Sequence, residues 1–328
     1  MDHIDIALNR DVEFHRVTTG LERFSLVYEA LPEIDRREVD LSISLFGRRL
    51  SMPLIISSMT GGASEGKRYN RIFANAAQHF GIAMGVGSQR VALEHPELAE
   101  TFMVRDVAPD ILLFANIGAV QLVDGYGIEE CERLVDMIDA DGLIIHLNPL
   151  HECAQLEGDT NFRGVAIKLR EICLGLEVPV IVKEVGHGIS ERTARLLADA
   201  GVDAIDIAGA GGTSWAKVES YRGTRLGPSL GEWGIPTADS LSAVRDAAPH
   251  AVLIASGGIK TGEDIAKSIA LGADGAAMAL PILKAAAISS EALDGFIAQL
   301  REELATAMFC AGARSIEELK RAPLRRSS

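Results

Sequence analysis

The feature that most constrains this chain is a series of eight short apolar segments, separated by segments with helical spacing. A short, nearly continuous apolar run is typical of a strand that is buried on both faces. Segments such as Ser190–Ala200 and Gly262–Leu271 carry apolar residues three and four positions apart, as amphipathic helices do. The predicted strands are Pro53–Met59, Ala83–Ser88, Leu112–Ala119, Gly142–Asn148, Val178–Val185, Asp203–Gly209, Val252–Gly258 and Asp274–Leu280.

Eight strand–helix units in succession predict a closed (β/α)8 TIM barrel, which leaves no strand edge exposed. The chain has 328 residues, and barrels of 200–250 residues with extensions are common. The alternative is an open, doubly wound sheet. Such a sheet more often shows an early G-x-G-x-x-G turn, and the sequence contains none.

The chain divides into three predicted parts. Residues 1–51 form an N-terminal extension packed on the barrel, in which Leu41–Leu45 alternates like an exposed hairpin strand. Residues 52–308 form the barrel, and 309–328 form a C-terminal tail whose last residues, 321–328, are expected to be a solvated end. The longest connection, 211–234, follows the sixth strand and is expected to carry function or to cover a site.

Composition excludes several classes of partner. The formal net charge of −14 argues against nucleic acid and anionic membranes, both of which select basic surfaces. No apolar run is long enough for membrane insertion, and the N-terminus lacks the pattern of a signal peptide, so a cytoplasmic location is predicted. The four cysteines, which fit no zinc spacing, are predicted to be reduced: Cys131, Cys153, Cys173 and Cys310.

Polar and glycine-rich motifs follow almost every predicted strand. The carboxyl ends of barrel strands are where enzymes of this fold place their sites. One such motif is weak evidence, but a full set at one face of the barrel indicates a ligand site there. The motifs are Met59–Gly62, Gly87–Arg90, Asn116, His146–Asp159, Lys183–Glu184, Gly209–Trp215, Ser256–Gly258 and Ala279–Leu280.

The turn Gly257-Gly258-Ile259 precedes a predicted helix, so free backbone N–H groups and a positive helix end could bind a phosphate there. The alternative is a turn that needs glycine only for its backbone angles. The small Ala279, with Leu280, ends the neighbouring strand. The two strand ends together predict a phosphate clamp.

Lys183 ends a very apolar strand, where a buried cation is costly unless it is paired. It is predicted to meet an anionic ligand or a cofactor atom, with an ion pair to Glu184 or Glu152 as the alternative.

Two further groups could bind anions. Gly209–Thr213 offers close backbone approaches and a hydroxyl, unless it serves only as a hinge for the long connection. Arg90, Arg222 and His146 could bind a second anion, although a lone arginine is more often a solvated surface residue.

These motifs, in this order and at this spacing, resemble the type 2 isopentenyl-diphosphate Δ-isomerases over about residues 2–320. The shared motifs include Met59–Gly62, Gly87–Arg90, Ala115–Ala119, His146–Pro149, Glu157–Asp159, Val182–Gly186, Gly211–Trp215 and Ser256–Ile259. The resemblance implies FMN, Mg²⁺, NADPH as reductant and a prenyl diphosphate substrate. It also implies a double-bond shift between isopentenyl and dimethylallyl diphosphate without net redox, by a homo-oligomer such as a tetramer or octamer.

Carried over residue by residue, the resemblance implies a set of site residues. The FMN contacts it implies are Met59, Thr60, Gly61, Ser88, Asn116, Lys183, Thr213, Gly257, Gly258, Ala279 and Leu280. The substrate contacts it implies are His3, Gln89, Arg90, His146 and Asn148. Glu152 matches the Mg²⁺ ligand, since a hard cation can bridge carboxylate and diphosphate oxygens.

Three departures from the family pattern bear on activity. The family has an Arg-Lys pair shortly before the histidine matched by His3, whereas this sequence opens with Met1-Asp2, which predicts the loss of those diphosphate contacts. The alternative is a start codon chosen too late, with the pair in an N-terminal extension. His151 replaces a glutamine near the reacting carbon and is the predicted catalytic residue, because a histidine can itself carry a proton near neutral pH. Ala208 replaces a serine near the flavin.

Three hypotheses follow. The first is the isomerase, with His151 in the role of the glutamine. The second is another FMN enzyme of this fold, acting on a longer prenyl substrate or oxidising a small hydroxy acid, since a histidine beside FMN suits hydride chemistry. The third is a flavin- or prenyl-diphosphate-binding protein without catalysis.

Overall fold

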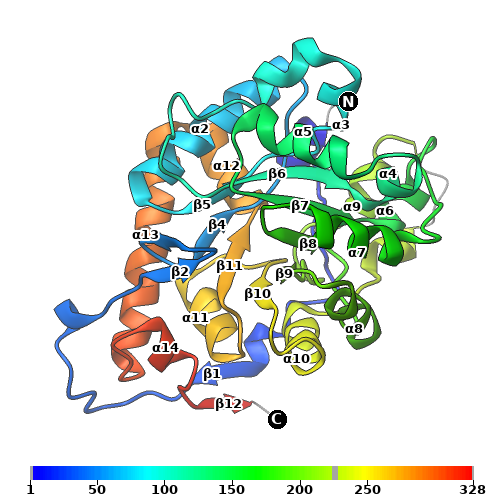
Figure 1. The fold of residues 1–328 in the computed structure, drawn as a ribbon. Coiled ribbons are helices and arrows are strands. Elements are labelled where there is room, and N and C mark those ends of the chain that lie inside the picture. Colours follow the sequence, from blue (N-terminus) through cyan, green and yellow to red (C-terminus); the bar gives the residue numbers. More distant parts are fainter. Residues whose placement is uncertain (1–2, 224–227, 327–328) are drawn as a thin grey trace.

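The computed structural model describes residues 3–223 and 228–326, and its centre is a closed barrel of parallel strands (Figure 1). The order around the barrel is β10-β11-β4-β5-β6-β7-β8-β9, so chain order is kept throughout and the predicted (β/α)8 barrel is confirmed. The barrel strands are β4 (Leu54–Ile56), β5 (Ala83–Gly85), β6 (Leu113–Gly118), β7 (Gly142–Leu147), β8 (Val180–Glu184), β9 (Ala204–Asp206), β10 (Val252–Ala255) and β11 (Gly275–Met278).

All eight strands lie inside the predicted segments, but the predictions run past their carboxyl ends. Segment 203–209 is one example, because ladder pairing of β9 stops at Asp206. Beyond it the backbone still bonds to the neighbouring segment, through Ile207 N–H to Ile254 O (3.1 Å) and Gly209 N–H to Ser256 O (2.8 Å). Apolar content also continues past the regular ladder, so sequence alone does not mark the point where the strand ends.

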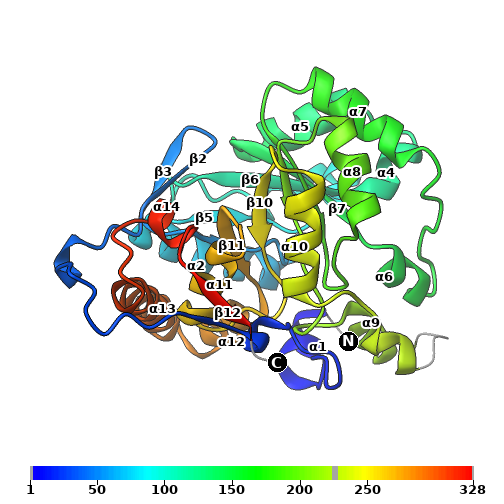
Figure 2. The ribbon, with the colours of Figure 1, turned by 90° about the horizontal axis from the view of Figure 1, so that it is seen from below.

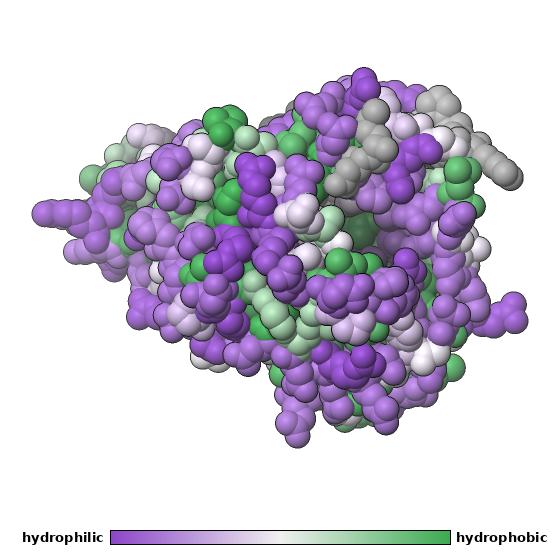
Figure 3. All heavy atoms as spheres, turned by 90° about the horizontal axis from the view of Figure 1, so that it is seen from above, coloured by the Kyte–Doolittle hydropathy of each residue, from purple (hydrophilic) through white to green (hydrophobic). Residues whose placement is uncertain are grey.

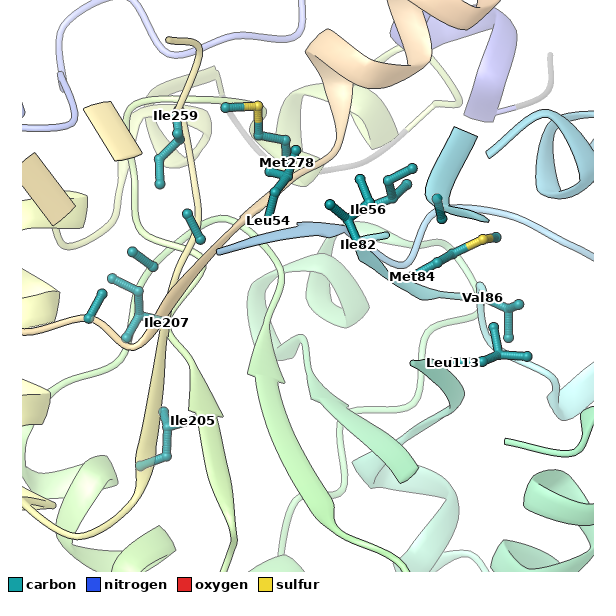
Figure 4. Packing of buried hydrophobic residues seen from close by; sticks show 14 of the residues in the cluster. Leu54, Ile56, Ile82, Met84, Val86, Leu113, Ile205, Ile207, Ile259 and Met278 are labelled. Carbon is teal, nitrogen blue, oxygen red and sulfur yellow. The ribbon is translucent and has the colours of Figure 1, made fainter. Parts of the chain in front are cut away.

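Helices surround the barrel and bury their apolar faces against its outer wall. Helix α8 starts at Glu191 because the Ser190 side chain accepts a hydrogen bond from the Thr193 N–H, as an N-cap does. The main covering helices are α2 (Ser64–Phe80), α4 (Ala119–Val123), α5 (Ile128–Ile138), α7 (Val165–Gly175), α8 (Glu191–Ala200), α10 (Thr237–Ala247), α11 (Gly262–Ala270), α12 (Leu280–Ile288) and α13 (Ser290–Cys310). Figure 4 shows part of this packing, with Leu54, Ile56 and Met278 in one cluster.

The N-terminal extension spans the barrel from one end to the other. Helix α1 (His3–Asn9) lies at the ligand-binding end, against α12 and α9 (Trp215–Ser220). The following segment is hydrogen-bonded to the loop after β9, through Phe14 N–H to Gly212 O (2.9 Å) and Ser214 N–H to Val12 O (2.8 Å). Figure 2 shows α1 and the hairpin formed by β2 (Ile43–Leu45) and β3 (Arg48–Leu50) at opposite ends of the barrel.

The hairpin closes one end of the barrel interior. Leu45 and Leu50 are almost fully buried and belong to the same cluster as the inward-facing Ile55, Phe114 and Ile144. The predicted hairpin is confirmed, but the expectation that it is exposed is wrong. Its apolar side is covered because the barrel mouth offers it an apolar surface.

The C-terminal tail contains two further elements. After α13 it forms α14 (Ile316–Leu319) and then β12 (Leu324–Arg326), which pairs antiparallel with β1 (Phe24–Leu26) of the N-terminal extension. The Arg325 and Arg326 side chains are exposed, as expected of a solvated end, but the pairing of residues 324–326 in a strand was not predicted.

The surface is mostly hydrophilic on the face shown in Figure 3, with a hollow whose depth is hydrophobic. No helix in residues 3–223 and 228–326 is long and apolar enough to cross a membrane. All four cysteines are free, as predicted.

Candidate functional site

A cavity opens at the carboxyl ends of the barrel strands, where the polar motifs were predicted to gather. Each of the eight barrel strands contributes to its wall, either from its carboxyl end or from the segment that follows it, and α1 adds His3, Ile4 and Ala7. Ten of the predicted FMN-contacting residues line it: Met59, Thr60, Ser88, Asn116, Lys183, Thr213, Gly257, Gly258, Ala279 and Leu280. The substrate and catalytic candidates His3, His146 and His151 line it as well.

Five predicted site residues lie outside the cavity lining: Gly61, Gln89, Arg90, Asn148 and Glu152. The Gln89 side chain is fully buried, where it donates to Leu134 O (3.1 Å) and accepts from Asn116 N–H (3.0 Å). The Arg90 side chain is half exposed, and its Nε lies 3.7 Å from Glu94. The Gln89 side chain thus links α5 to β6. The Arg90 side chain lies at the surface.

Gly61 packs against Phe102 rather than against the cavity. A β-carbon at Gly61 would lie 1.8 Å from Cε1 of the Phe102 ring. Glycine is needed here for the close approach of backbone and ring.

Lys183 lies in a buried polar network, and the carboxylate nearest to it is neither Glu184 nor Glu152, the two alternative ion-pair partners. Its Nζ donates to the Glu184 backbone carbonyl (2.7 Å) and lies 3.8 Å from Asp206 Oδ2. Ser256 donates its hydroxyl to the other oxygen of Asp206. Burial raises the pKa of Asp206, and the Lys183 charge and the Ser256 hydrogen bond counteract that rise. Lys183 is therefore oriented by one carboxylate while it faces the cavity.

Two histidines from distant parts of the chain meet at one buried carboxylate. The Nε2 atoms of His3 and His151 lie 2.8 Å and 2.9 Å from the same oxygen of Glu219, whose side chain is only 3% exposed. The indole of Trp215 stacks at a tilt on His151, with ring centroids 4.8 Å apart, and His3 packs edge-on against it. This cluster joins α1, α6 (Pro149–Ala154) and α9 beside the cavity.

Glu219 is ionised at neutral pH. Burial alone would raise its pKa, but the hydrogen bonds from His151 and His3 outweigh that effect and hold the pKa far below its ordinary range. A fixed negative charge therefore orients both imidazoles. Sequence reasoning missed Glu219. The signal that could have found it is a carboxylate on α9 that follows the buried Ala216 and Val218, four residues after Trp215 of the site motif.

His146 is a neutral imidazole on the cavity wall. Loss of hydration, reinforced by the positive charges of His151, Lys183 and Arg90, lowers the pKa of His146 to about 3. Its Nδ1 lies 3.0 Å from Asn116 Oδ1, so Nδ1 carries the proton and donates it. His146 accordingly offers no permanent charge to an anion, and a bound diphosphate would have to raise the pKa of His146 to make it a cation.

Glu152 is held by its own loop. Its two oxygens accept hydrogen bonds from Asn148 Nδ2 (2.7 Å) and from the Asp159 backbone N–H (2.8 Å). The Asn148 amide oxygen is buried without a hydrogen-bond partner in the described part of the chain. A carboxylate has about four acceptor positions, so Glu152 keeps capacity for a cation beside an unpaired amide oxygen.

Backbone geometry brings the chain close to the cavity at the loops after β9 and β10. Gly257 and Gly258 have φ values of +95° and +72°, and a β-carbon at Gly258 would lie 2.6 Å from Gly211 O. Ala208, which lacks the hydroxyl of the family serine, also has a positive φ of +36°. Such a value is uncommon for a residue other than glycine and marks local strain at the cavity wall.

Comparison with known proteins now decides the family. The FMN-dependent dehydrogenase family matches residues 1–99 and 155–326. An isopentenyl-diphosphate delta-isomerase of Nostoc sp. strain PCC 7120 is 53% identical over 324 residues, covering 97% of this chain and 93% of that protein. The chain belongs to both the FMN-dependent dehydrogenase family and the isopentenyl-diphosphate delta-isomerase family.

A second member of the isomerase family is similar over nearly its whole length. The isopentenyl-diphosphate delta-isomerase of Deinococcus radiodurans is 46% identical, with 97% of this chain and 95% of that protein covered. Among solved structures, a mandelate oxidase variant with a C4a-OH-FMN adduct superposes with a TM-score of 0.70 at 18% identity, covering 100% of this chain and 96% of that chain. At that identity the likeness shows the barrel fold.

Membership in these families supports FMN as a cofactor, and the cavity fits it. The Ser58 hydroxyl lines the cavity and is buried without a hydrogen-bond partner among residues 3–223 and 228–326. A polar group left unpaired in the wall is expected where a polar ligand completes it. Backbone-lined turns and the Lys183 cation are the other features a phosphorylated flavin needs.

Proposed function

We propose that the chain interconverts isopentenyl diphosphate and dimethylallyl diphosphate, using reduced FMN and Mg²⁺. The observation that carries the proposal is the cavity itself, because ten predicted flavin contacts and three histidines meet in it. Near-full-length identity to proteins named isopentenyl-diphosphate delta-isomerase supports the reaction.

The residues that would hold FMN surround the cavity. Gly257, Gly258, Ala279 and Leu280 would receive the phosphate, while Asn116 and Lys183 would face polar atoms of the flavin. When bound and reduced, FMN supplies an electron-rich ring that stabilises positive charge developing in a neighbouring substrate.

The isomerisation moves protons and transfers no net electrons. One proton is added to one carbon of the substrate and one is removed from another, so the chain needs a group that can carry a proton at the cavity. His151 lies on the cavity wall and is held by the ionised Glu219. The fixed carboxylate orients the ring and stabilises it when it is protonated, which is the arrangement that general acid–base catalysis requires.

Diphosphate binding is assigned to fewer residues than the sequence predicted. His3 and His146 lie on the cavity wall, whereas Gln89 and Arg90 lie elsewhere. Arg222 is a further candidate, since its Nη1 lies 2.9 Å from His3 Nε2 and its side chain is 40% exposed. An exposed arginine beside the site can pivot towards an anion at little cost.

Glu152 would hold Mg²⁺ through oxygen ligands, and Glu152→Gln tests this role. The substitution keeps the shape and the hydrogen bond from Asp159 N–H but removes the charge that a hard cation needs. We expect flavin content to stay unchanged while turnover at limiting Mg²⁺ falls by about tenfold or more, in line with the loss of a charged contact. The measurement is turnover against Mg²⁺ concentration. An unchanged Mg²⁺ dependence would exclude Glu152 as a ligand.

The proton-carrying role of His151 predicts a change in pH dependence. His151→Gln restores the amide of the family pattern and removes the imidazole, the side chain that changes charge near neutral pH. We expect one ionisation to vanish from the pH profile of turnover under reducing conditions with saturating Mg²⁺. Two superimposable profiles would show that His151 does not transfer the proton.

The proposal as a whole is tested with FMN-loaded, chemically reduced protein, Mg²⁺ and isopentenyl diphosphate. Formation of dimethylallyl diphosphate is the expected result. No isomerisation by a flavin-containing protein would contradict it and favour the second hypothesis, which predicts flavin reduction by a small 2-hydroxy acid instead.

NADPH as the physiological reductant, a cytoplasmic location and assembly into a homo-oligomer remain predictions. Each is expected of an enzyme with this chemistry, and each is open to direct measurement.

A further inference from the structure

Three side chains of the kinds that ligate transition metals converge beside the cavity. They are His3, His151 and Glu219, and their ligand atoms all lie within 4.8 Å of one another. The three come from α1, α6 and α9, which are far apart in the chain and meet only in the fold. Both histidines aim the same ring nitrogen, Nε2, at the carboxylate.

The donor set selects the type of cation. Two imidazole nitrogens and one carboxylate oxygen suit Zn²⁺ and similar borderline ions, whereas Mg²⁺ prefers oxygen ligands alone. His3 and His151 also line the cavity, so the side facing it is open for a water molecule or a substrate atom. Three protein ligands with an open position are typical of reactive zinc sites rather than closed structural ones.

The spacing of the donor atoms is close to what such an ion needs. With bonds of about 2.0–2.1 Å, tetrahedral coordination separates two ligand atoms by about 3.4 Å. The present nitrogen-to-oxygen distances are 2.8 Å and 2.9 Å, so each imidazole would move outwards by about half an ångström to admit the ion. His3 has room for this movement, because its side chain is 36% exposed at the start of α1.

Charges around the cluster act in both directions. Glu219 supplies a buried negative charge that attracts a cation. Arg222 opposes it, because its Nη1 lies 3.0 Å from the second oxygen of Glu219 and 2.9 Å from His3 Nε2. Arg222 is partly exposed and can leave the cluster, so it weakens cation binding without preventing it.

We propose that His3, His151 and Glu219 form a binding site for a Zn²⁺-type divalent cation at the wall of the cavity. It is distinct from the Mg²⁺ role assigned to Glu152, whose oxygens are bonded to Asn148 and Asp159. A bound ion ties α1 to the barrel and takes the imidazole that the isomerisation would use. Zn²⁺ therefore inhibits turnover by occupying the imidazole that would carry the proton. Metal binding itself does not rest on the proposed isomerase activity.

The test is equilibrium dialysis of the FMN-loaded protein against buffered Zn²⁺, with bound zinc per chain measured by atomic absorption. The expected result is one tightly held Zn²⁺ per chain that millimolar Mg²⁺ does not displace. His151→Gln should weaken binding by at least about a hundredfold, since it removes a direct ligand. Arg222→Met should tighten it, because the opposing charge is gone.

Two substitutions control for binding elsewhere. His15→Asn removes the exposed His15–Asp11 pair, and Cys153→Ser removes the exposed thiol. Both variants should bind zinc as the unchanged protein does. Absence of stoichiometric zinc in the unchanged protein, or undiminished binding by His151→Gln, would overturn the proposal. Flavin content verifies that each variant is folded, and dialysis decides the matter even if isomerisation is absent.

Discussion

Replacing Lys183 with methionine is expected to lower the free energy of unfolding by about 3–5 kcal/mol at neutral pH, the range measured when one partner of a buried ion pair is removed. The Lys183 and Asp206 side chains are only 10% and 5% exposed. Methionine fills most of the lysine volume, so lost packing contributes little. The dominant cost is an Asp206 carboxylate that is left buried without its cation.

The stability lost in Lys183→Met should increase as the pH rises. Burial already raises the pKa of Asp206, and Lys183 is the main group that counteracts it, so the pKa rises further in the variant. A carboxyl group with a raised pKa in the folded state loses stability as pH increases from the unfolded pKa, about 3.9, towards the folded one. In urea unfolding, the free energy of unfolding of the variant should therefore lie further below that of the unchanged protein at pH 8 than at pH 5.

A second substitution separates this electrostatic cost from lost flavin. Asp206→Asn, added to Lys183→Met, removes the uncompensated charge and should restore much of the stability, while flavin affinity stays low. A deficit that is independent of pH, or that the double variant does not relieve, would show that Lys183 stabilises the protein mainly through the bound cofactor.

The barrel could be predicted from sequence because each of its strands is marked by a pattern within a few consecutive residues. Buried parallel strands need continuous apolar runs, and Val180–Val182 shows such a run plainly. The ends of the strands could not be located, because Ile207 and Ala208 remain apolar and buried after β9 has ended. The site face followed from the fold, since all barrel strands end at the same rim.

The pairings within the site could not be predicted, because they depend on which distant residues meet. Lys183 was predicted to meet an anionic ligand or a cofactor atom, with an ion pair to Glu184 or Glu152 as the alternative. The carboxylate nearest to it is instead Asp206 on the adjacent strand. Gln89 belongs to the site motif Gly87–Arg90, yet its side chain turns inward and bonds to Leu134 O. Nothing in the sequence around Glu219 shows that His3 and His151 approach it from two other elements.

The strands β1 and β12, near the two ends of the chain, were missed for the same reason. Residues 24–26 read Phe-Ser-Leu and residues 324–326 read Leu-Arg-Arg, and three residues are too few to mark either segment as a strand. Each becomes a strand only because the other lies beside it. Alternation in 41–45 was visible, but the apolar barrel opening that covers it was not.

Glu219→Gln is expected to reduce turnover by about a hundredfold or more, the usual range for loss of acid–base assistance. Glutamine keeps the shape and one acceptor oxygen, so the histidines can stay in place, but the charge that orients and stabilises a protonated His151 is gone. Stability should fall too. The lowered pKa of Glu219 contributes stability above the unfolded pKa, about 4.3, and that contribution is lost as pH falls. The difference in unfolding free energy between variant and unchanged protein should accordingly shrink in acid.

Glu232→Gln is the matched control for this prediction. Glu232 is also a buried carboxylate, with a side chain 9% exposed, and hydrogen bonds from Lys217, Arg16 and His15 lower its pKa to about 2 despite burial. Its hydrogen bonds in the described part of the chain come from Lys217 and the backbone of residues 15–17, not from His3 or His151. The control should therefore lose stability in the same pH-dependent way and keep near-normal turnover with reduced FMN and saturating Mg²⁺. Equal losses of turnover in the two variants would mean that Glu219 acts by holding the loop after β9 in place, because only a role at the histidines distinguishes the two carboxylates.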